Sequence, residues 1–126
     1  MLGSLFIRTK EEKSTLDDCA TWLSDILNVK FSASRFSENS GGGRYLFGEV
    51  LGLRAKLEMA DDQDFSEYQF YLSFKPLSHS AEKLDLHALD GLADILAKYL
   101  AELGASIARP TELGKAGAPI SYYSPK

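Results

Sequence analysis

Alternation of apolar and polar residues dominates the middle of the chain. The odd positions of residues 45–59 are Tyr45, Phe47, Glu49, Leu51, Leu53, Ala55, Leu57 and Met59. The even positions of the same stretch end in three charged residues: Arg54, Lys56 and Glu58. A period of two is typical of a half-buried strand, so we expect the odd side chains to face the core. Gly48 and Gly52 interrupt the pattern, which leaves open one long bent strand or two short strands hinged near Gly52.

A second alternating run follows shortly afterwards. Its apolar members are Tyr68, Phe70, Leu72 and Phe74, and Pro76 ends it because proline cannot donate a hydrogen bond to a strand ladder. The intervening residues, 60–67, are few enough for an antiparallel connection. The sequence therefore predicts a central antiparallel pair of strands with one apolar face.

Two helices flank this pair. The first begins with a hydroxyl and a carboxylate three residues on, within Ser14 to Asp17, and its apolar stripe runs to Asn28, where we expect it to stop. The second spans residues 86–103 and ends before Gly104, a residue suited to a left-handed terminator.

Short apolar runs at residues 4–9, 31–36 and 105–109 predict three further strands. The expected order is β-α-β-β-β-α-β. We therefore predict an α+β fold: an antiparallel-rich sheet of about five to six strands with two helices on one face. Residues 1–109 form the predicted domain, and residues 110–126 are interpreted as an extended C-terminal tail.

Length and charge narrow the class of protein. With 126 residues the chain is expected to form one domain, and its net charge of −4 argues against a surface for nucleic-acid phosphates while permitting a basic partner. A single cysteine excludes an internal disulfide and fits a reducing compartment. No signal peptide or membrane span is evident, so we expect a cytoplasmic protein.

The candidate chemistry is sparse. Cys19 lies on the apolar stripe of the first helix and is interpreted as a core residue. His79 and His87 are eight residues apart, which is not the spacing of a zinc site. The glycines at 41–43 precede a strand, whereas a phosphate-binding loop precedes a helix. The sequence predicts no catalytic residues, no metal and no cofactor, and thus a protein that is not an enzyme.

Carboxylates gather around the turn between the two central strands. They are Glu58, Asp61, Asp62, Asp64 and Glu67, and no lysine or arginine falls among them. Their spacing does not match a calcium-binding loop. Two interpretations remain: a solvated loop that keeps a sheet edge soluble, and a docking surface that steers a basic partner. These five residues are the predicted partner-binding site.

The segment YLFGEVLGLRAKLEMADDQDFSEYQFYLSF, residues 45–74, resembles the central hairpin of small immunity proteins from bacterial polymorphic-toxin and contact-dependent growth inhibition systems. The shared features are the glycine-punctuated strand, the acidic turn and the strand that follows. The resemblance implies a cytoplasmic, non-catalytic protein that binds and neutralises one cognate toxin domain, often a nuclease. It assigns no contact residues, and it implies neither direct nucleic-acid binding nor a membrane.

Type III secretion chaperones are a rival resemblance. They are also small, acidic, cytoplasmic α+β proteins, and they bind an unfolded effector segment as dimers. Their fold carries a glycine-containing strand pair after the second helix, and we expect this chain to lack that pair and to end in an extended tail.

Overall fold

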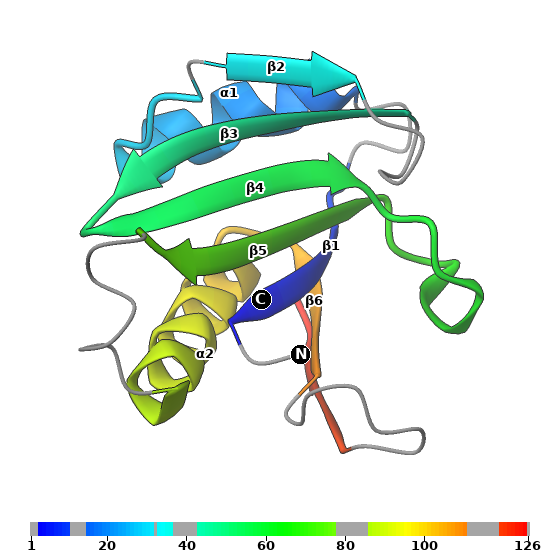
Figure 1. Cartoon of the computed structure of the whole chain (residues 1–126). Coiled ribbons are helices and arrows are strands. Elements are labelled where there is room, and N and C mark those ends of the chain that lie inside the picture. The colour runs from blue at the N-terminus through cyan, green and yellow to red at the C-terminus, as the bar shows by residue number, and fades with distance from the viewer. Residues whose placement is uncertain are drawn as a thin grey trace.

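One antiparallel sheet forms the front layer of the molecule and two helices form the back layer (Figure 1). The computed structural model describes residues 3–10, 15–31, 33–36, 43–77, 86–110 and 119–125. The elements in these residues are β1 (Ser4–Arg8), α1 (Leu16–Leu27), β2 (Ala33–Phe36), β3 (Arg44–Val50), β4 (Leu53–Met59), β5 (Phe70–Pro76), α2 (Leu86–Glu102), β6 (Ser106–Pro110) and β7 (Ile120–Tyr123). Within this described part the sheet has seven strands in the order β2-β3-β4-β5-β1-β6-β7.

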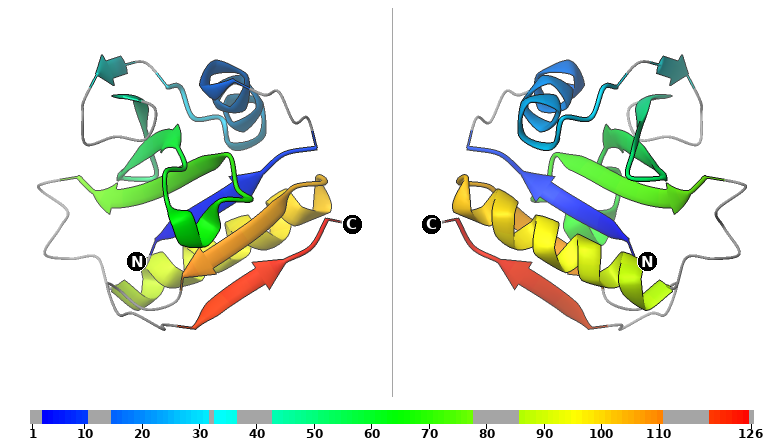
Figure 2. Two further views of the ribbon diagram at one scale, coloured as in Figure 1. Left: turned by 90° about the vertical axis from the view of Figure 1, so that its right-hand side faces the viewer. Right: turned by 90° about the vertical axis from the view of Figure 1, so that its left-hand side faces the viewer.

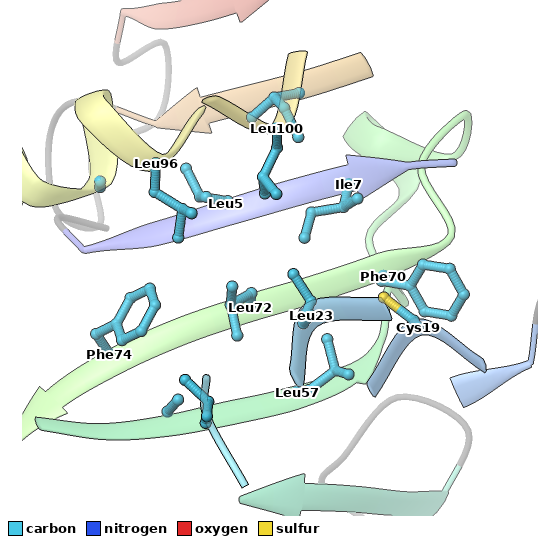
Figure 3. Packing of buried hydrophobic residues seen from close by; sticks show 14 of the residues in the cluster. Leu5, Ile7, Cys19, Leu23, Leu57, Phe70, Leu72, Phe74, Leu96 and Leu100 are labelled. Carbon is cyan, nitrogen blue, oxygen red and sulfur yellow. The ribbon is translucent and has the colours of Figure 1, made fainter. Parts of the chain in front are cut away.

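Both helices cover the same face of the sheet, as the two side views show (Figure 2). Leu23 of α1 and Leu100 of α2 pack with Leu57, Phe70 and Leu72 of the sheet in one core cluster (Figure 3). All five side chains are fully buried. The predicted α+β class and the placement of two helices on one face are confirmed.

Local signals set the helix ends. Thr15 caps α1: its Oγ1 accepts a hydrogen bond from the N–H of Asp18, and the Asp18 carboxylate accepts one from the N–H of Thr15. Asn28 ends α1 in the left-handed conformation, and Gly104, with φ of 101°, follows the end of α2. Both predicted stops are confirmed.

The central stretch is two strands, which decides between the alternatives left open by the sequence. Leu51 and Gly52 form a two-residue turn with φ of 52° and 75°, and Val50 pairs with Leu53 across it. Residues that pair across two strands lie on the same face of the sheet, so Val50 and Leu53 share a face. The even-numbered residues of β3 and the odd-numbered residues of β4 therefore point to the same side. In β4 the odd residues face the helices, as predicted.

In β3 the predicted inward assignment is wrong. Leu46 is buried in the core and Val50 packs against it, so the even side of β3 faces the helices. Tyr45, Phe47 and Glu49 therefore face the opposite side, the open face of the sheet that is turned towards the viewer in Figure 1.

At Gly48 the backbone of β3 approaches another segment of the chain closely. A Cβ atom at this position would lie 2.3 Å from the carbonyl oxygen of Lys30, in the segment that follows α1. Any side chain here would force that segment away from β3.

The chain after α2 contributes more than one strand. Residues 120–123, which the sequence places in the tail, form β7 and pair with β6, Ile107 opposite Tyr123. Two strands therefore follow the second helix, but neither contains the glycine expected of the chaperone strand pair, and the sheet has one strand more than the upper predicted number. Residues 111–118, residue 126, His79 and the side chain of His87 lie outside the described part of the structure.

Among the described residues, no helix combines the length and the apolar character that crossing a membrane requires.

Candidate functional site

Residues 60–69 connect β4 to β5 and carry most of the predicted binding residues; we call this segment the acidic loop. Its carboxylates Asp61, Asp62, Asp64 and Glu67 are all exposed. In the part of the chain that the structure describes, none of the four forms an ion pair with a lysine or arginine. Four negative charges are thus presented to solvent from one short connection.

The loop is fixed to the sheet by an aromatic stack. Phe65, in the 3₁₀ turn Gln63–Phe65, lies parallel to Phe6 of β1, with ring centroids 4.0 Å apart and planes 5° from parallel. Tyr68 and Tyr71 contact the same Phe6 ring at centroid distances of 6.4 and 4.7 Å. Such stacked pairs contribute roughly 0.5–1.5 kcal/mol beyond the area they bury. Phe65, one apolar residue within an acidic run, was the signal in the sequence that could have indicated this contact.

Hydrogen bonds close the base of the loop. The N–H of Ala60 donates to the carbonyl of Gln69 at 2.8 Å, and the N–H of Gln69 donates to the carbonyl of Ile7 at 3.0 Å. The Gln69 side-chain oxygen accepts from both the N–H and the hydroxyl of Thr9, at 3.0 and 2.9 Å. The acidic loop therefore has little conformational freedom left to lose when it binds a partner.

Within the loop, Asp62 has a structural role as well as a charge. Its Oδ1 accepts a hydrogen bond of 2.9 Å from the N–H of Asp64 and so caps the 3₁₀ turn. Asp61 makes no comparable contact, which makes it the better position at which to test charge alone.

Glu58 does not share the surface of the other four predicted residues. Its side chain is only 14% exposed, its Oε2 has no hydrogen-bond partner, and the nearest cation is Lys56, with Nζ 3.8 Å away. The structure therefore brings together Asp61, Asp62, Asp64 and Glu67 and leaves Glu58 on β4, on the open face of the sheet.

The described residues contain no group of three His, Cys, Asp or Glu side chains placed to hold a metal ion. Burial raises the pKa of Cys19 to about 12, so its thiol stays protonated at neutral pH and is a poor nucleophile. This agrees with the interpretation of Cys19 as a core residue.

A polar network that the sequence did not predict joins the C-terminal elements. The buried guanidinium of Arg109 on β6 contacts Asp90 of α2 and donates to the hydroxyl of Tyr123 on β7 at 2.9 Å. Tyr123 in turn donates to Asp94, which also binds Lys98 at 3.0 Å. The spacing of Asp90 and Asp94 on one helix face was a signal, but their partners come from distant strands. The network ties β7 to α2.

In comparisons with family models, with curated proteins and with solved structures, nothing matched this chain.

Proposed function

We propose that this protein is a non-catalytic binding protein whose acidic loop docks a basic partner, and that it acts in the cytoplasm as the immunity protein of a cognate bacterial toxin domain. The observation that carries the proposal is the pinned acidic loop, in which four exposed carboxylates stand on a segment held by the Phe65 stack. A rigid cluster of one sign of charge steers an oppositely charged partner and orders little on binding.

The test takes as partner the basic toxin domain that this proposal expects to be encoded beside the gene. Reversing Asp61, Asp62 and Asp64 to lysine is expected to slow association by about tenfold or more at low salt, with a smaller effect at high salt. Stopped-flow or interferometry measurements at several ionic strengths check this. Unchanged rates would remove the loop from the interface.

A matched pair of single substitutions separates local from global charge. Asp61→Lys on the loop and Asp25→Lys on α1 change the net charge equally, and both side chains are exposed. Only Asp61→Lys is expected to weaken binding, by about tenfold. Equal losses from the two variants would mean that overall charge, not this surface, governs association.

A third substitution tests the rigidity of the acidic loop without changing its charge. Phe65→Ala removes the stack on Phe6 and leaves every carboxylate in place. The loop must then be ordered on binding, so we expect affinity about tenfold weaker while the salt dependence stays as steep.

The secretion chaperone is a second candidate, and one observation favours it. Ile95 and Tyr99 of α2, with Leu103 directly after its end, form an apolar stripe in which the residues are 67%, 45% and 45% exposed. Such a stripe is a contact surface for a dimer. Sedimentation velocity decides: a dimer that Ile95→Lys converts to a monomer favours the chaperone, whereas a monomeric wild type favours the immunity protein.

A further inference from the structure

Three cations gather on the open face of the sheet, in a hollow remote from both helices. The hollow has a volume of about 480 Å³ and is lined by Tyr45, Phe47, Arg54, Lys56, Ser73 and Lys75. It lies within the size range of small-molecule sites, about 300–1,000 Å³. We call it the basic hollow. Positive charge concentrated here is unexpected in a chain of net charge −4.

The register places two of the cations in direct opposition. Arg54 of β4 pairs with Lys75 of β5, so their side chains leave the same face at neighbouring positions. Like charges in this arrangement destabilise a sheet. Among the described residues neither Arg54 nor Lys75 forms an ion pair, although Glu49 stands opposite Arg54 on the other side.

The cations rest on aromatic rings. The Arg54 guanidinium lies 5.1 Å from the centroid of the Phe47 ring, and Lys56 Nζ lies 4.5 Å from that of Tyr45. The two rings are neighbours, with centroids 6.0 Å apart. A cation held by a ring face keeps its full charge and its N–H donors available to an anion.

Acidic residues limit how far the positive surface extends. Glu58 follows Lys56 on β4 and Glu49 flanks Arg54 on β3, so the positive stretch covers two outward residues of β4, about 7 Å. A long polyanion would run over these carboxylates. The hollow suits one doubly charged group and one planar ring.

We propose that the basic hollow binds a nucleoside monophosphate or a phosphate monoester of similar build. The phosphate bridges Arg54 and Lys75, and the planar group packs against Tyr45 and Phe47. A phosphate monoester carries a charge of about −2, which matches two opposed cations, and guanidinium binds phosphate oxygens in pairs. Aromatic side chains on a strand are suitable partners for a base. This site is separate from the acidic loop.

Calorimetry with uridine monophosphate, uridine and inorganic phosphate tests the proposal on the full chain. We expect the nucleotide to bind more tightly than phosphate alone, and uridine not to bind. Arg54→Gln and Lys75→Gln are each expected to weaken nucleotide binding by about tenfold or more. Lys30→Gln, a change of equal charge at an exposed position beyond α1, is the matched control and should leave affinity unchanged.

Thermal unfolding supplies a second measurement that does not depend on a ligand-binding signal. Without nucleotide, Lys75→Gln is expected to unfold at the wild-type temperature or above, because it removes the repulsion with Arg54. At one nucleotide concentration, wild type and Lys30→Gln should gain more stability than Arg54→Gln and Lys75→Gln.

Four results would overturn the proposal. They are no nucleotide binding at millimolar concentration, equal losses in the Lys30→Gln control, far tighter binding of a ten-residue oligouridine at the same site, and binding of an acidic peptide in place of the nucleotide.

Discussion

Leu51 adopts a conformation that few leucines adopt. Its φ is 52° at the first position of the β3–β4 turn, and the residue is 83% exposed. A left-handed conformation costs a residue with a Cβ roughly 1–2 kcal/mol, and asparagine tolerates it better than leucine does. The side chain therefore gains nothing from packing that would offset the backbone cost.

Leu51→Asn is accordingly expected to stabilise the protein, by about 0.5–1 kcal/mol in urea unfolding. Gly52→Ala, at the next position with φ of 75°, is the opposite control and should destabilise it. A destabilised Leu51→Asn variant would show that the exposed leucine has a contact that this conformation does not reveal.

Leu57 illustrates the opposite case, a side chain that is fully buried between the sheet and α1. Leu57→Ala removes apolar contacts and leaves a cavity, so we expect a loss of about 2–5 kcal/mol in the free energy of unfolding. Leu51→Ala is the control: the same truncation at an exposed site should leave stability nearly unchanged. A negligible loss at Leu57 would contradict the inward assignment of β4.

At the scale of elements, β7 is held to the sheet by backbone pairing and to α2 by side chains. The hydrogen bond from Tyr123, with one from Lys98, holds the pKa of Asp94 below its ordinary value of 3.8. Burial and the bond to Asp94 raise the pKa of Tyr123. Both shifts favour the pair in which Asp94 is charged and Tyr123 is protonated.

This linkage sets a direction for pH dependence. Because the folded pKa of Asp94 is depressed, its contribution to stability is fully present above the unfolded pKa of about 3.9 and is lost as the pH falls through the lower folded value. We expect the stability difference between wild type and Asp94→Asn to be constant near neutrality and to shrink below about pH 4. Urea unfolding at pH 7, 5 and 3 measures it, and a difference independent of pH would contradict the linkage.

Some elements of the fold could be predicted from the sequence and others could not. Periodicity predicted β4, β5 and both helices, because each has a long run with one buried face. It failed on β3, where the two-residue turn at Leu51 and Gly52 reverses the inward parity while Tyr45 and Phe47 continue to look like core residues. The basic hollow was missed for the same reason, since its aromatic wall had been assigned to the interior. The acidic loop was visible from composition, whereas its stack on Phe6 depends on a strand about sixty residues away.

For the whole molecule, the two proposed surfaces carry opposite charge. The acidic loop projects where β4 passes into β5 (Figure 1). The basic hollow lies on the open face of β3, β4 and β5. Neither surface includes a residue of α1 or α2, because both helices cover the other face of the sheet (Figure 2). Substitutions on the two surfaces should therefore act independently: Asp61→Lys should leave nucleotide binding intact, and Lys75→Gln should leave toxin binding intact.

The order of strands in the sheet differs from the order in which a ribosome delivers them. β1 appears first, yet both of its neighbours, β5 and β6, come late, and Leu5 must wait for Leu72 and Ile7 for Ile107. Until β5 has left the exit tunnel, this early strand with three consecutive apolar residues has no neighbour to pair with, and its other edge stays unpaired until β6 follows. The sheet of the nascent chain therefore stays incomplete for most of its synthesis. β1 is the strand that finally connects β2-β3-β4-β5 to β6-β7.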